Sequence, residues 1–132
     1  MNILDTSIHV LLIEDDMVDV LHIKYGFREY NIKNTLDVAN NGIKALNKLY
    51  DKEAHLPKLI ILDINIPKMN GFELLKKLKM HPQYKLIPVV MVTTSNAVQD
   101  RKAAADLNVA GYFIRPLKFE EFMPLYSKIV SV

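Results

Sequence analysis

Five short hydrophobic segments recur along the chain, separated by longer polar ones. Each is four to six residues long, and several are apolar throughout instead of alternating with polar residues, a pattern typical of strands buried on both faces of a sheet. We expect strands over HVLLI (9–13), NTLDVA (34–39), KLIIL (58–62), PVVMV (88–92) and GYFI (111–114).

The segments between these strands have the spacing of amphipathic helices. In residues 16–30, the hydrophobic side chains of Val20, Ile23, Phe27 and Tyr30 fall on one helical face. The same spacing predicts further helices over 41–54, 72–80, 97–107 and from about residue 118 to the C-terminal end. Strands that alternate with helices imply right-handed crossovers and a parallel sheet covered by helices on both faces. We therefore predict one α/β domain over residues 1–132, with no linker and no further domain.

Two helices carry specific expectations about how they begin. Asn96 is expected to be the N-cap of the fourth helix, because its side chain can accept hydrogen bonds from free backbone N–H groups. If the last helix begins at Lys118, Pro124 lies in its interior and removes a hydrogen bond at a cost of roughly 3 kcal/mol. A kink near Glu120–Glu121 or a later start would relieve most of that cost.

Composition and charge exclude several classes of protein. Half of the 132 residues are hydrophobic, and 17 Lys and Arg face 15 Asp and Glu, which argues against a disordered chain or a polybasic nucleic-acid arm. The absence of Cys excludes disulfides, thiolate metal sites and a Cys nucleophile. Neither a membrane span nor a secretory signal is evident. We expect a soluble cytoplasmic domain that binds neither DNA nor membranes directly.

Polar residues gather where the expected strands end. Glu14 and Asp15 follow the first strand, Asp63 the third, Thr93 the fourth and Arg115 the fifth. Ligands of open parallel sheets bind at the carboxyl ends of the strands, so we expect these five residues at one edge. Asp16 and Asp19 read instead as a helix cap and a solvent-exposed residue.

Three carboxylates against one guanidinium leave an excess of negative charge at that edge. A divalent cation would offset it, and an all-oxygen ligand set without His or Cys favours Mg²⁺. A carboxylate that is free to attack phosphorus in such a pocket favours phosphoryl transfer onto that carboxylate. The hydroxyl group of Thr93 and the cation of Arg115 would then contact the transferred group.

Four segments of the chain resemble, in order, the signatures of bacterial two-component response regulator receiver domains: LLIEDD (11–16), IILDINIPKMNGFELL (60–75), PVVMVTTSN (88–96) and GYFIRPL (111–117). The resemblance extends from about residue 8 to the C-terminal end. It implies a flavodoxin-like doubly wound (βα)5 fold, as in chemotaxis regulators, with strand order 2-1-3-4-5. The EDDxxD opening and the expected lack of an output domain are similar to the small regulators associated with bacterial phytochromes.

The resemblance also assigns the acidic residues. Asp63 matches the phosphoacceptor, which attacks the phosphoryl group of a phosphohistidine. Glu14 and Asp15 match the acid pair that holds Mg²⁺ together with Asp63, and the backbone carbonyl of Asn65 matches a further metal ligand. Pro67 and Gly71, in the segment after Asp63, match residues that shape the following turn.

The conformational switch is assigned in the same way. Thr93 matches the hydroxyl that moves to bond the phosphoryl group, and Tyr112 matches the aromatic side chain that changes rotamer with it. Arg115 stands where the family usually has Lys, before a proline joined by a cis peptide bond. Arg keeps the charge but replaces a compact ammonium group by a planar, bulkier one.

These matches imply a stand-alone phosphorelay receiver that takes its phosphoryl group from a sensor histidine kinase or phosphotransfer protein. Its phosphorylation would change contacts on the face formed by residues 97–130, including those of a homodimer. Catalysis would be limited to Mg²⁺-dependent self-phosphorylation and slow self-dephosphorylation. A phosphatase with an Asp nucleophile is one alternative, but it needs an acid at position 65, where Asn65 stands. A degenerate receiver that works without phosphate is the other, and Arg115 is the feature in its favour.

Overall fold

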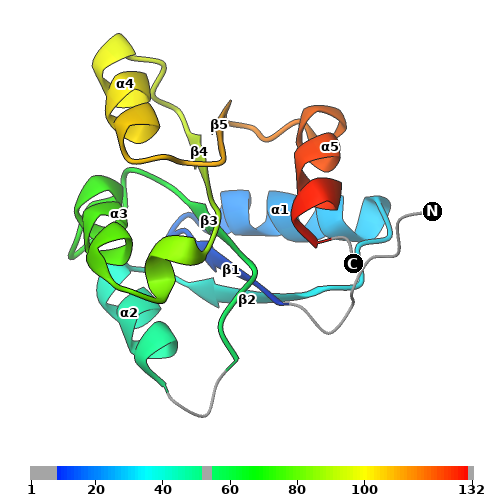
Figure 1. Ribbon diagram of the computed structural model, residues 1–132. Helices are drawn as coiled ribbons and strands as arrows, with labels where there is room; N and C mark the ends of the chain where they lie inside the picture. Colours follow the sequence, from blue (N-terminus) through cyan, green and yellow to red (C-terminus); the bar gives the residue numbers. More distant parts are fainter. Residues whose placement is uncertain (1–8, 52–54, 131–132) are drawn as a thin grey trace.

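The computed structural model describes residues 9–51 and 55–130, and these contain a single five-stranded parallel sheet (Figure 1). The strands lie in the order β2-β1-β3-β4-β5, which confirms the predicted doubly wound topology. They run over His9–Ile13 (β1), Thr35–Ala39 (β2), Leu59–Leu62 (β3), Val89–Thr93 (β4) and Gly111–Ile114 (β5). The order reverses between β1 and β3, so these two strands lie side by side although α1, β2 and α2 separate them in sequence.

Helices cover both faces of the sheet (Figure 1). The helices are α1 (Met17–Glu29), α2 (Gly42–Tyr50), α3 (Gly71–Met80), α4 (Val98–Asp106) and α5 (Phe119–Val130), with a short 3-10 helix η1 at Tyr84–Leu86 that the pattern did not predict. Side chains of α1 and α5 form one hydrophobic core with one face of the sheet, and those of α2, α3 and α4 form a second core on the other face. Each central strand contributes alternate residues to the two cores, which explains why β3 is apolar throughout and why β1 and β4 are apolar except for His9 and Thr93 at their ends.

Of the two helix caps expected from the sequence, Asp16 is confirmed and Asn96 is not. The side chains of Asp16, Asn41 and Asn70 accept backbone N–H bonds at the starts of α1, α2 and α3. The prediction for Asn96 was wrong. The N-cap of α4 is Ala97, without a side-chain bond, and Asn96 Oδ1 accepts a bond from Arg101 Nε at 2.6 Å instead.

The last helix runs through its proline. It spans Phe119–Val130 with Pro124 inside, so the alternative of a later start was wrong. Its hydrophobic stripe is buried, and Phe122 and Tyr126 are among the largest fully buried side chains of the described residues. The helix predicted over 41–54 is shorter than expected: α2 ends at Tyr50, and positions 52–54 lie outside the described residues. None of the helices in the described ranges has the length and hydrophobicity that crossing a membrane requires.

Candidate functional site

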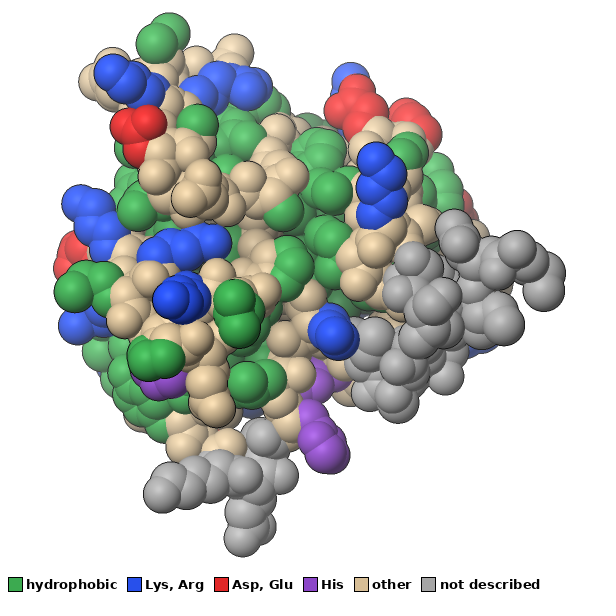
Figure 2. Space-filling model, viewed as in Figure 1, with side chains coloured by type: hydrophobic (Ala, Val, Ile, Leu, Met, Phe, Trp, Pro, Cys, Tyr) green, Lys and Arg blue, Asp and Glu red, His purple; other side chains and the backbone are tan. Residues whose placement is uncertain are grey.

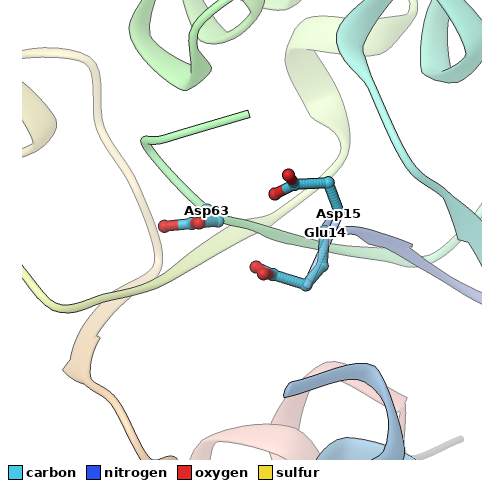
Figure 3. Close-up of side chains that lie close together, drawn as sticks. All are labelled: Glu14, Asp15 and Asp63. Atoms are coloured by element: carbon cyan, nitrogen blue, oxygen red, sulfur yellow. The ribbon is translucent and has the colours of Figure 1, made fainter. Parts of the chain in front are cut away.

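Two acidic residues directly follow the two adjacent central strands. Glu14 follows β1 and Asp63 follows β3, and both are buried, at 4% and 2% exposure. With the exposed Asp15 they form a group in which one carboxylate oxygen from each residue lies within 4.8 Å of those from the other two (Figure 3). In Figure 3 the Glu14 and Asp15 side chains extend from the end of β1 toward Asp63. This acidic group can hold one metal ion.

The backbone of these residues continues the hydrogen-bond ladder of the sheet. The N–H of Glu14 donates to the carbonyl of Ala39 at 3.0 Å, and that of Asp63 donates to the carbonyl of Ile13 at 3.2 Å. On the far side, the N–H of Arg115 donates to the carbonyl of Thr93 at 2.8 Å. The charged side chains therefore start from backbone that is held as firmly as the strands themselves.

The chain after Asp63 turns back sharply toward α3. The N–H of Gly71 donates to the carbonyl of Ile64 at 2.7 Å, and a Cβ at position 71 would lie only 2.4 Å from the carbonyl oxygen of Asp63. Position 71 therefore requires glycine for close approach. Within the turn, Asn65 is exposed and Lys68 has a positive φ of 68°.

Arg115 connects the acidic residues to the loop that follows β5. Its Nη1 lies 3.0 Å from Glu14 Oε1 and also forms an ion pair with Asp19 Oδ2, while Nη2 lies 3.6 Å from Asp63 Oδ2. The peptide bond between Arg115 and Pro116 is cis, as the resemblance implied. One guanidinium is therefore shared among three carboxylates.

Crowding of buried carboxylates changes the protonation of Glu14. Burial raises its pKa to about 8, the Asp63 carboxylate adds to the increase, and Arg115 opposes it. Asp63 Oδ1 is also buried, and within the described chain it has no hydrogen-bond partner. A buried oxygen without a partner, next to two further carboxylates, fits the ligand set of a hard divalent cation.

Thr93 and Tyr112 lie on neighbouring strands and meet at the loop after β4. Thr93 is fully buried, and its Oγ1 accepts a bond from the N–H of Ser95 at 3.3 Å. The Tyr112 hydroxyl donates to the carbonyl of Ser95 at 2.8 Å, and the Arg101 guanidinium lies over its ring, 4.8 Å from the centroid. Both side chains therefore contact the same loop residue, one at its N–H and one at its carbonyl.

Two residues at the site were not identified from the sequence. Asp19, expected to face solvent, pairs with Arg115, and His22, expected at the surface or its boundary, has Nε2 2.9 Å from the carbonyl oxygen of Leu117. The position of Asp19 in the first turn of α1 indicates only that it lies near the acid pair, and nothing in the sequence points to its pairing with Arg115. The contact of His22 depends on the loop after β5 and has no local signal.

Comparison with known proteins supports the resemblance found in the sequence. The family model of the response regulator receiver domain matches residues 10–126. A solved two-component response regulator from Legionella pneumophila is 36% identical, with a TM-score of 0.82 over 93% of this chain and 98% of that one. Response regulator Rcp1 of Synechocystis is 30% identical over 92% of this chain and 86% of its own length. Its Mn²⁺-bound structure gives a TM-score of 0.77 over 91% and 89% of the two chains.

Two further relatives differ in how much of their length this chain covers. The bacteriophytochrome response regulator AtBRR is 26% identical, with a TM-score of 0.83 over 96% of this chain and 94% of its own. By contrast, the chain spans 48% of the length of ArlR from Staphylococcus aureus, to which it is 28% identical over 86% of this chain. The chain thus belongs to the response regulator receiver family of two-component phosphorelay systems, and it is similar to regulators associated with bacterial phytochromes.

Proposed function

We propose that this protein is a stand-alone receiver, one domain over residues 1–132, that takes a phosphoryl group onto Asp63 from the phosphohistidine of a sensor histidine kinase or phosphotransfer protein. The observation that carries the proposal is the buried Asp63 carboxylate, whose Oδ1 has no hydrogen-bond partner among the described residues and which lies beside two further acids and a guanidinium. In the transfer, a carboxylate oxygen of Asp63 forms a bond to phosphorus as the P–N bond breaks. The imidazole leaves with the electron pair and takes a proton from solvent.

Magnesium fits the acidic group formed by Glu14, Asp15 and Asp63, with the backbone carbonyl of Asn65 as a further ligand. The ligands are all oxygens, which Mg²⁺ prefers, and a solved structure of the related Rcp1 contains Mn²⁺, a cation of similar ligand preference. A bound cation supplies positive charge that offsets repulsion between the carboxylates and the incoming phosphoryl oxygens. Arg115 adds a second positive charge, since its Nη2 lies 3.6 Å from Asp63 Oδ2.

The response to phosphorylation passes through Thr93 and Tyr112. The phosphoryl group brings a charge of about −1 beyond that of the carboxylate, together with strong acceptor oxygens. Thr93 Oγ1 would leave the N–H of Ser95 to donate to those oxygens. The loop would then shift, and Tyr112 would lose or change its bond to the Ser95 carbonyl.

The surface that this shift alters is the face formed by residues 97–130. Figure 2 shows hydrophobic side chains between the charged ends of α4 and α5, over the edge strand β5. On this strand Tyr112 and Phe113 are partly exposed, Ile114 is 36% exposed, and Val98 on α4 is 80% exposed. An exposed strand edge with hydrophobic side chains suits contact with a downstream protein or a second copy of this chain.

The proposal also covers the reaction that the protein catalyses and its location in the cell. Asn65 cannot donate a proton to a leaving group, so we expect no turnover of phosphate esters beyond self-phosphorylation and slow self-dephosphorylation. We also propose that the protein acts in the cytoplasm, where the partner kinase would present its phosphohistidine. The degenerate alternative is not favoured, because the guanidinium of Arg115 keeps the expected positive charge beside Asp63.

Labelling with a small phosphodonor tests the proposal. With Mg²⁺ and acetyl phosphate, wild-type protein should gain one acid-stable, base-labile phosphate, measured by intact mass. Asp63→Asn should gain none, and Asp106→Asn, at an exposed acid on α4, should label like wild type. Equal labelling of Asp63→Asn and wild type refutes the site. Failure of wild type to label with any donor would restore the degenerate alternative.

A further inference from the structure

Helix α1 holds the loop after β5 at two points, one turn apart. Asp19 forms its ion pair with Arg115, and His22 Nε2 lies 2.9 Å from the carbonyl oxygen of Leu117. The two contacts lie on either side of Pro116. The position of the Arg115 backbone is thus fixed from α1 as well as from β4.

The carboxylates that Arg115 contacts have different roles. Glu14 and Asp63 belong to the acidic group that can hold a metal ion, whereas Asp19 lies outside it. A cation that binds Glu14 competes with Arg115 Nη1 for the same oxygen, Oε1, or its neighbour. Asp19 is therefore the carboxylate that Arg115 keeps when Glu14 turns to the cation.

The pair between Asp19 and Arg115 is shielded from solvent. Their side chains are 24% and 15% exposed, so the charges interact more strongly than in a surface ion pair. Arg115 Nε has no hydrogen-bond partner among the residues that the structure describes. The direction of the guanidinium therefore depends on the partners of its two terminal nitrogens, and Asp19 is one of them.

We propose that Asp19 is a positioning residue, which holds the Arg115 guanidinium at the rim of the acidic group so that Glu14 is released to a divalent cation and Nη2 stays directed at Asp63. The inference rests on the proposed function, because it concerns the same metal site. An Arg is longer and wider than the Lys usual at this position, and it has two nitrogens to satisfy. Without Asp19, both would turn to Glu14 and Asp63, the residues the cation needs.

Metal binding provides the first test. Titration calorimetry with Mg²⁺ should give a dissociation constant about fivefold higher for Asp19→Asn than for wild type. The matched control is Asp16→Asn, which removes the same formal charge from the same helix end. Asn keeps the cap on the Val18 N–H, and Asp16 has no contact with Arg115 among the described interactions. The proposal expects a clearly smaller effect from Asp16→Asn, and equal effects would overturn it.

A double-mutant cycle with Arg115→Gln separates positioning from a general field effect. If Asp19 acts through Arg115, Asp19→Asn has little effect on Mg²⁺ affinity in the Arg115→Gln background. The same loss in both backgrounds would overturn the proposal. Asp19→Glu keeps the charge and should lie closer to wild type than to Asp19→Asn. A structural role alone would lower the melting temperature of Asp19→Asn without changing the affinity, and this too would overturn it.

The outcome does not depend on whether Asp63 accepts phosphate. Wild-type protein that binds Mg²⁺ but takes no label would contradict the proposed function and leave the Asp19 cycle readable. Wild-type protein that labels, with Asp19→Asn indistinguishable from it in Mg²⁺ affinity, would contradict the role of Asp19 alone.

Discussion

The hydroxyl group of Tyr112 donates a hydrogen bond to the backbone carbonyl of Ser95 over 2.8 Å, which links the edge strand β5 to the loop between β4 and α4. The Arg101 guanidinium covers the ring from the α4 side. The side chain of Tyr112 therefore ties the loop that follows Thr93 to the edge strand of the sheet. A rearrangement that moves the Ser95 carbonyl away from β5 has to break this bond.

Tyr112→Phe tests the strength of this link. Removing the hydroxyl leaves the ring and its Arg101 contact but abolishes the bond to Ser95, so we expect the free energy of unfolding to fall by about 1 kcal/mol. Urea denaturation measures it. Tyr30→Phe is the control, because its hydroxyl lies 3.4 Å from Glu120 at an exposed position and should contribute less. Equal losses in both variants would contradict the prediction.

Gly71→Ala should disturb the site itself. The added Cβ would meet the Asp63 carbonyl oxygen at 2.4 Å and Ile64 Cα at 2.7 Å, and neither backbone atom can move freely. We expect a loss of about 1–3 kcal/mol in unfolding free energy and weaker Mg²⁺ binding. Gly42→Ala is a matched control, since Gly42 also begins a helix behind an Asn cap, but its Cβ would meet the side chain of Met69 at 2.8 Å instead of the backbone of Asp63. It should leave Mg²⁺ affinity unchanged.

The stability of the metal-free protein should fall as the pH rises from about 5 to about 8. Folded Glu14 has a pKa raised to about 8 from 4.5, mainly by burial, so it holds a proton in this range that the unfolded chain has released. Folding then takes up a proton, and raising the pH opposes it. Urea denaturation in a chelator should show this slope in wild type and a flatter one in Glu14→Gln. Parallel slopes would refute it.

Metal binding should show the reverse dependence. A cation at Glu14 requires its ionised form, so binding below about pH 8 releases a proton and becomes tighter as the pH rises. Calorimetry in buffers of different ionisation enthalpy measures that proton. In Glu14→Gln the proton release should disappear, and its persistence would assign the proton to another group.

Pro124→Ala should stabilise the protein. Pro124 lies inside α5 and has no N–H to donate to the carbonyl four residues earlier. It is exposed, so Ala restores the helical bond without loss of core packing, and we expect a gain of up to about 3 kcal/mol. Pro82→Ala, at an exposed position between α3 and η1, should give no comparable gain in the same denaturation experiment.

The strands were predicted to within about a residue, because burial on both faces leaves a continuous apolar signal that few other structures produce. The helices were also located, but the buried face of α2 was predicted less accurately. The spacing in residues 41–54 puts Ile43, Leu46, Leu49 and Tyr50 on one hydrophobic face. Leu46 and Leu49 are buried as predicted, but Ile43 and Tyr50 are 43% and 56% exposed, and Ala45 is buried as well. A short helix allows two neighbouring faces to be read as hydrophobic, and only packing against the sheet decides between them.

The acidic residues at the strand ends could be located from the sequence because parallel topology brings those ends together whatever the details of packing. One of the three carboxylate partners of Arg115, Asp19, could not be located in this way. Its pairing with Arg115 depends on how far the guanidinium reaches and on where the loop after β5 passes α1, neither of which leaves a pattern in the sequence. Residues joined by topology are thus predictable here, and residues joined by the reach of a side chain are not.

The hydrogen-bond ladder that continues through Glu14, Asp63 and Arg115 divides the protein by stiffness. The atoms that carry charge stand on backbone braced by the sheet, while the chain beyond Thr93 leaves that bracing and depends on side-chain bonds at Ser95. A change in charge on the rigid backbone at the strand ends is therefore expected to move the less constrained loop after Thr93. The signal is the movement of that loop.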